Sequence, residues 1–369
     1  VMLAVIAMAA VGIYNYQKLP IDAVPDITNV QVQINTGAPG YSPLEVEQRI
    51  TFPIETVMNG LPGLEQTRSL SKYGLSQVTV VFEDGTDIWF ARQLVSERLQ
   101  GVRAALPANV EPAMGPTATG LGEIFYWTVE AKEGARKPDG TPYTPMDLRE
   151  IQDWIVAPQL RGVPGVTEVN TIGGYLKEYL VAPDMDRLAA HGLSLDVLVK
   201  AIDRNNANAG AGYIERRGEQ FLIRAPGQVR TLDDIRNTVL SNVKGVAIRV
   251  RDVATVDIGR ELRTGAATEN GKEVVLGTVF MLIGENSRAV SQAVAAKMVE
   301  VNRSLPKGVK AVPVYDRTVL VDKAINTVKK NLLEGAVLVI VILFLFLGNI
   351  RAAIITAMVI DRKSTRLNS

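Results

Sequence analysis

Apolar residues recur at every second position near residue 30, where Val30, Val32 and Ile34 alternate with glutamine and asparagine. This period of two predicts a strand with one buried face. The next apolar stripe lies within 46–57 and steps by three or four residues, which predicts a helix. The same two periodicities predict the remaining elements before residue 115, namely strands over 64–71 and 76–82, a helix over 86–105 and a last strand led by Val110. The predicted order is βαββαβ, that of ferredoxin-like domains.

The first predicted helix carries its own start signals. Ser42 takes the N-cap position, Pro43 takes the first helical position, and Glu45 closes a capping box. Pro53 lies inside the helix and should kink it, because proline has no N–H for the carbonyl of the preceding turn.

The same order of elements is predicted a second time after residue 120. Its members are strands over 122–130, 166–172, 274–283 and 309–314, a helix that starts at Thr144 and a helix that starts near Asn286. The run Ser42–Glu45 recurs as Thr144–Asp147, 102 positions later, whereas Thr79–Phe82 recurs as Thr278–Met281, 199 positions later. The offset grows by 97 residues, so the second copy holds an insertion the size of a small domain, over roughly 175–261.

The insertion has a predicted helix of its own over 195–205. The glycines within 208–212 favour a projecting loop. Duplicated α+β modules, one of them interrupted, suggest a structure that works by relative motion of its halves.

Apolar segments flank the two modules. We expect residues 1–16 to be a truncated transmembrane helix, because their apolar run is shorter than the roughly 20 residues that a bilayer requires. A second transmembrane helix is expected over 320–348, with Glu334 near the interface. The apolar run over 352–360 is expected to be the truncated start of a third.

The sequence around the second apolar segment indicates its orientation. Arg351 follows the segment and marks that side as cytoplasmic. The residues from about 20 to 317 would then lie outside the cytoplasm. The polar run 361–369 interrupts the third apolar segment, and we expect it to be non-native sequence.

Composition and charge exclude several classes of protein. With 40 Lys and Arg against 39 Asp and Glu, the net charge of +1 predicts no basic face for nucleic acid. The absence of cysteine excludes disulfides and thiolate metal ligands. His191 is the one histidine, and it lies in a predicted helix-terminating turn. No nucleophile, base and orienting group occur together, so the sequence predicts neither an enzyme nor a bound cofactor.

Carboxylates are the better candidates for metal ligands, because hard and borderline cations accept oxygen donors. Glu123 shares a face with Phe125 and Trp127 on a predicted strand, and a carboxylate on an apolar face needs a partner, which a cation could supply. A strand-end charge that reaches water or an arginine is the alternative. Glu130, on the opposite strand face, and Asp153, in the first helix of the second module, are weaker candidates.

Other polar and sulfur-containing residues have simpler roles. Glu83, Asp84 and Asp87 are expected to form the turn and cap of a helix. The nine methionines are scattered, which favours core filling over copper or silver binding.

Five runs of sequence resemble those of one transporter family. They are Pro20–Asp26, Phe82–Asp87, Gly115–Gly120, Val250–Ala254 and Leu345–Arg351. On these runs the chain resembles the resistance-nodulation-division transporters, specifically the cobalt–zinc–cadmium branch of their heavy-metal efflux family. The resemblance covers residues 1 to about 360 and corresponds to the N-terminal part of a much longer family chain.

The resemblance implies an α+β membrane protein fragment with two ferredoxin-like porter subdomains, over 25–115 and over 116–174 with 262–317. The insertion at 175–261 would be a docking subdomain, whose loop near 206–212 reaches into a neighbouring subunit. The pump would be a homotrimer of the bacterial inner membrane, completed by a periplasmic adaptor protein and an outer-membrane channel. Family members export divalent cations by proton antiport, and their proton-relay carboxylates lie in later helices.

Two other functions stay open at this point. A multidrug exporter of the related hydrophobe family would have aromatic-lined porter clefts, whereas aromatic residues make up 6% of this chain. An extracytoplasmic ligand-sensing receptor would place a signalling helix with heptads after the second membrane segment. A third apolar run begins there instead, at Ala352, which favours a transporter.

Overall fold

A computed structural model of the chain describes residues 11–12, 14–15, 27–225, 227–243, 245–263 and 265–347. Most of the expected segment 1–16, and all of 352–360 and 361–369, lie outside these residues. The chain divides into two compact units. The first unit comprises Val1–Thr128, Trp154–Thr171 and Leu276–Ser369, and the second comprises Val129–Asp153 and Ile172–Val275.

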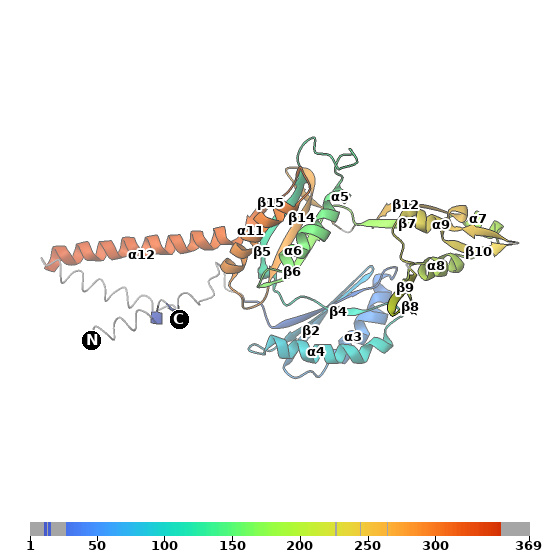
Figure 1. Cartoon of the computed structure of the whole chain (residues 1–369). Helices are drawn as coiled ribbons and strands as arrows, with labels where there is room; N and C mark the ends of the chain where they lie inside the picture. Colours follow the sequence, from blue (N-terminus) through green and yellow to red (C-terminus); the bar gives the residue numbers. More distant parts are fainter. Residues whose placement is uncertain are drawn as a thin grey trace. The chain divides into compact units, whose positions relative to one another are not determined.

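The first unit contains a four-stranded antiparallel sheet in the order β2-β3-β1-β4. Figure 1 labels two of its strands, β2 and β4, and two helices that accompany the sheet, α3 and α4. Its strands are β1 (Gln31–Gly37), β2 (Leu64–Lys72), β3 (Leu75–Phe82) and β4 (Pro112–Met114). Its helical segments are α2 (Pro43–Val46), the π-helical turn η1 (Glu47–Thr51), α3 (Phe52–Met58), α4 (Ile88–Val102) and the 3₁₀ turn η2 (Arg103–Ala105). The observed order is the predicted βαββαβ.

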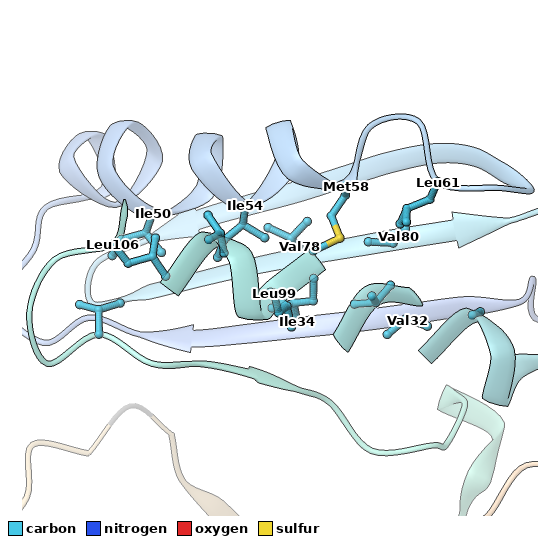
Figure 2. Close-up of a cluster of buried hydrophobic side chains, with 14 of the residues drawn as sticks. Val32, Ile34, Ile50, Ile54, Met58, Leu61, Val78, Val80, Leu99 and Leu106 are labelled. Atoms are coloured by element: carbon cyan, nitrogen blue, oxygen red, sulfur yellow. The ribbon is translucent and has the colours of Figure 1, made fainter. Parts of the chain in front are cut away.

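The hydrophobic stripes predicted from the sequence meet in one core. Figure 2 shows Ile50, Ile54 and Met58 pointing from the helical layer towards Val78 and Val80 of β3. All five side chains are fully buried. The helices therefore cover one face of the sheet, which is the packing that a strand with one apolar face requires.

Local signals set the boundaries of these elements. Ser42 caps α2 in a capping box with Glu45, as predicted. The irregularity expected at Pro53 appears as the π-helical turn η1 just before it. The prediction that Val110 leads the last strand is wrong. The Val110 N–H donates to the carbonyl of Pro107 in a turn, so the strand starts at Pro112.

A second, five-stranded sheet contains β13-β14-β5-β15 in that order, with β6 also paired to β14. Its strands are β5 (Glu123–Ala131), β6 (Val166–Ile172), β13 (Ala267–Glu269), β14 (Lys272–Met281) and β15 (Val309–Asp316). The associated helical segments are the 3₁₀ turn η3 (Gly120–Gly122), α5 (Pro145–Ile151), the π-helical turn η4 (Gln152–Val156), α6 (Ala157–Arg161) and α11 (Ser287–Ser304). The predicted helix starts are confirmed, since Thr144 caps α5 and Asn286 caps α11.

The second unit contains the predicted insertion, which begins and ends on a two-stranded antiparallel ribbon of β7 (Lys177–Pro183) and β12 (Ala254–Arg260). Between them lie α7 (Met185–Ala190), α8 (Leu195–Arg204), β8 (Ala209–Arg216), β9 (Glu219–Ala225), α9 (Leu232–Asn237), β10 (Val239–Val243), β11 (Val246–Arg249) and α10 (Val250–Val253). Two buried clusters here, one including Leu198 and Val250 and one including Leu188 and Val253, draw all their members from within 181–256.

Two local predictions within the insertion have different outcomes. His191 ends α7 and Gly192 follows with a positive φ, as a helix-terminating turn requires. The projecting loop expected over 208–212 is wrong from Ala209 onward. These residues belong to β8, whose first two residues, Ala209 and Gly210, pair with Ala225 and Arg224 of β9, so a partner strand satisfies their backbone groups.

The helix predicted over 320–348 is present as α12 (Arg317–Leu347). Within the part of the chain that the structure describes, no helix combines the length and the apolar character that crossing a membrane requires.

Candidate functional site

Strand β5 carries the strongest candidate from the sequence and is anchored by aromatic residues. Phe125 and Trp127 are buried, and their ring centroids lie 6.3 Å apart. Gly277 of β14 lies directly against the Trp127 indole, where a Cβ atom would come within 2.7 Å of Nε1. This close fit positions β5 beside β14. Because Glu123 and Tyr126 lie on β5, it also positions these two residues.

Glu123 begins β5 and is half-buried. The phenolic hydroxyl of Tyr126 donates a hydrogen bond to its carboxylate oxygen Oε2. The carboxylate that the sequence places on the apolar face of Phe125 therefore has a side-chain partner, a tyrosine. Glu123 directly follows the 3₁₀ turn Gly120–Gly122, so strict strand alternation is not yet established at this position.

Tyr126 connects Glu123 to a more distant part of the chain. Its ring packs against that of Tyr315 of β15, with 5.0 Å between the ring centroids. Burial is the main cause that raises the pKa of the Tyr126 phenol, followed by its hydrogen bond to Glu123, while the positive charge of Arg317 acts in the opposite direction. The phenol therefore stays protonated near neutral pH and remains a hydrogen-bond donor.

Arg317 is the first residue of α12, and only 6% of it is exposed. The sequence patterns did not identify Tyr126, Tyr315 and Arg317 as site residues. The signal that could have found them is a tyrosine and an arginine at the point where the last strand of the sheet passes into the long helix. A buried arginine there needs electrostatic compensation.

The other two candidates have different surroundings. Asp153 forms an ion pair with Arg149, with 2.6 Å between Oδ2 and Nε. Arg149 also donates from Nη1 to the carbonyl oxygen of Gly173, at 2.9 Å. Glu130 is half-buried further along β5. Among the described residues, no three or more histidine, cysteine, aspartate or glutamate side chains form a group that could hold a metal ion.

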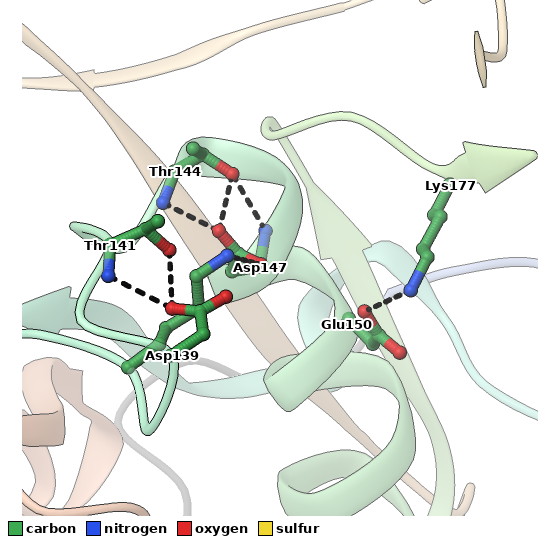
Figure 3. Close-up of polar contacts among 7 residues, drawn as sticks. Asp139, Thr141, Thr144, Asp147, Glu150 and Lys177 are labelled. Carbon is green, nitrogen blue, oxygen red and sulfur yellow. Dashed lines mark hydrogen bonds and ion pairs between the residues drawn. The ribbon is translucent and has the colours of Figure 1, made fainter. Parts of the chain in front are cut away.

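A further set of carboxylates lies near α5, and protein side chains and backbone groups already bind them (Figure 3). Asp147 accepts hydrogen bonds from the backbone and hydroxyl of Thr144 and forms an ion pair with Lys137 at 3.0 Å. Burial opposes these contacts, but together they hold the pKa of Asp147 below its usual value. Glu150 pairs with Lys177 at 3.3 Å. These carboxylates stabilise local structure, so Glu123 remains the candidate of most interest.

Comparison with known proteins places this geometry in context. The model of the AcrB/AcrD/AcrF family matches residues 1–361. The chain is 72% identical over 360 residues to the cobalt-zinc-cadmium resistance protein CzcA of Cupriavidus metallidurans, covering 98% of this chain and 34% of that protein. It is 47% identical over 377 residues to the nickel-cobalt-cadmium resistance protein NccA of Alcaligenes xylosoxydans xylosoxydans, covering 96% of this chain and 35% of that protein.

The fold of the chain also matches that of a solved structure. The X-ray crystal structure of a heavy metal efflux pump superposes with a TM-score of 0.87 at 37% sequence identity, covering 97% of this chain and 35% of that one. The chain thus spans about a third of the length of the curated relatives it matches. Since the family match extends over nearly all of its residues, the chain belongs to the AcrB/AcrD/AcrF family.

Proposed function

We propose that this chain is the N-terminal part of a proton-driven pump that exports divalent heavy-metal cations, specifically zinc, cobalt and cadmium. The observation that carries the proposal is the 72% identity to the cobalt-zinc-cadmium resistance protein. Identity falls to 47% for the nickel-cobalt-cadmium resistance protein and to 40% for the cation efflux system protein CusA of Escherichia coli K12. The gradient favours the first of these substrate sets.

We further propose the architecture that this function needs. Two ferredoxin-like porter subdomains would occupy residues 25–115 and residues 116–174 with 262–317. The docking subdomain would occupy residues 175–261. Membrane helices would occupy residues 1–16, 320–348 and 352–360. Residues from about 20 to 317 would then face the periplasm. The separate hydrophobic clusters of the first sheet and of the insertion support this division.

The assembly proposed for the whole pump is a homotrimer in the inner membrane, joined by a periplasmic adaptor protein and an outer-membrane channel. Protons would drive export as a cation:proton antiport. Membership of the transporter family supports these proposals.

Glu123 is the residue we propose to meet the transported cation. Its side chain is half-buried, and its hydrogen-bond partner is the neutral Tyr126 hydroxyl. A cation that binds the carboxylate therefore has to replace a neutral donor and not a positively charged side chain. Asp153 is a weaker candidate because a cation would have to break its ion pair with Arg149. Glu130 stays a prediction from the sequence.

Metal tolerance of cells tests this proposal. The full-length gene should raise the tolerance of a metal-sensitive bacterial strain to zinc, cobalt and cadmium, and Glu123→Gln should lower that tolerance at equal expression, because the neutral amide is a poor cation ligand. The matched control is Glu133→Gln, a change of the same charge at an exposed turn residue, which should behave as wild type. Wild-type tolerance in the Glu123 variant would remove Glu123 from the transport path, and no gain from the intact gene would contradict export.

A further inference from the structure

The contacts of Tyr126 join two parts of the first unit that have separate roles in the proposed pump. At one end, its hydroxyl donates to the carboxylate of Glu123. At the other, its ring lies 5.0 Å from that of Tyr315, two residues before Arg317. Arg317 is buried and its charge acts on the Tyr126 phenol. The Tyr126 side chain therefore lies between Glu123 and Tyr315, two residues before α12 begins.

The start of α12 is firmly held to α11. The Asp316 carboxylate accepts hydrogen bonds from the Ser291 hydroxyl at 2.7 Å and from the Thr318 N–H at 2.8 Å. One turn later, Arg288 forms an ion pair with Asp322 at 2.6 Å. Val321, between these contacts, is fully buried. These contacts attach the first turns of α12 to α11 and to the end of β15.

We propose that Tyr126 is a positioning residue that couples the occupancy of Glu123 to the base of α12. A divalent cation and the phenolic O–H compete for the lone pairs of the same carboxylate. When a cation binds Glu123, the hydrogen bond breaks and the Tyr126 ring is free to shift against Tyr315, at the end of the strand that leads into α12. The inference rests on the proposed function, in which Glu123 meets the cation.

The competition gives the coupling a direction. In the cation-free state the hydrogen bond to Glu123 holds Tyr126 against Tyr315. In the cation-bound state the Glu123 carboxylate binds the cation and no longer accepts the hydrogen bond from Tyr126. A ligand shifts such an equilibrium only by the difference between its affinities for the two states. The lost hydrogen bond to a charged group supplies that difference here.

Zinc transport by the full-length protein in liposomes tests the coupling. Tyr126→Phe keeps the ring and removes the hydroxyl, so zinc no longer competes with a donor. The half-saturating zinc concentration should fall by about three- to tenfold, as expected for losing a partly exposed hydrogen bond to a charged group. The maximal rate should fall too, because binding is no longer transmitted to α12. A merely structural role would not lower the half-saturating concentration.

The matched control is Tyr143→Phe, the same change at a half-buried tyrosine of the second unit, which should leave both transport parameters at wild-type values. Near-ultraviolet difference absorption gives a second readout. Adding zinc should produce a tyrosine difference signal in the wild type and in Tyr143→Phe, but not in Tyr126→Phe. Unchanged transport parameters in Tyr126→Phe would overturn the coupling.

Failure of the coupling can be separated from failure of the proposed site. If Glu123→Gln impairs zinc transport while Tyr126→Phe matches the wild type, Glu123 meets the cation but Tyr126 does not report it. If Glu123→Gln itself transports zinc as the wild type does, the site is wrong, and the coupling falls with it.

Discussion

Replacing Gly277 with alanine is expected to destabilise the sheet around β5 strongly, although it adds only one methyl group. The added Cβ would overlap the indole of Trp127 and lie 2.7 Å from its Nε1 atom. Trp127 is fully buried at the centre of β5, so rotation of its indole would disturb the packing around it. We expect a loss of about 3 kcal/mol in the free energy of unfolding, the upper range for an overpacked core.

The apparent melting temperature of purified full-length protein, followed by tryptophan fluorescence, measures this effect. Gly101→Ala is the matched control, because no atom lies within 4 Å of the added methyl group and Gly101 itself is exposed, in the last turn of α4. That variant should melt at the wild-type temperature or slightly above it, since alanine favours a helix by up to about 1 kcal/mol. Equal melting of the two variants would show that Trp127 does not pack on Gly277.

Replacing Gly174 with alanine is expected to disrupt the point where the chain enters the insertion. Gly174 has a φ of +66° and a Cβ there would lie 2.8 Å from the carbonyl oxygen of Pro145 and 2.9 Å from the Cβ of Arg149. Arg149 cannot move freely, because it pairs with Asp153 and donates to the carbonyl of Gly173. The variant therefore suffers both backbone strain and a steric clash, together about 3 kcal/mol.

Gly192 separates the two causes. Its φ of +65° is nearly the same, but nothing lies within 4 Å of an added Cβ. Gly192→Ala should therefore lose only the strain of a left-handed alanine, about 1 kcal/mol. Limited proteolysis of the two variants of the full-length protein reads out the difference, with faster cleavage near 174 in Gly174→Ala. Equal proteolysis would mean that the close packing around Gly174 contributes nothing.

The elements of this fold that depend on local signals were predictable. The capping boxes at Ser42 and Thr144 mark helix starts that the structure confirms, because a cap is satisfied by atoms within three residues. The hairpin of β8 and β9 was not predicted. Its glycines by themselves favour a loop, and only the pairing partner makes a strand of them.

One residue of the candidate site, Glu123, could be predicted from the sequence, but its contacts with other residues could not. Glu123 stands out as a carboxylate beside buried aromatic residues. Tyr126 lies three positions along the same strand, where simple alternation directs it to the other face. Tyr315 comes 189 residues later, and its position beside Tyr126 follows from the pairing of β15 with β5. Sequence periodicity predicts the order of the strands but not which side chains of β5 and β15 lie beside each other.

Zinc movement driven by a proton gradient tests the central claim most directly. Full-length protein in sealed liposomes, loaded with a zinc-sensitive dye and given an imposed pH difference, should move zinc against its concentration gradient. A protonophore should abolish the movement. Zinc flux equal to that of protein-free liposomes, with the pH difference intact and the protein folded, would contradict the account.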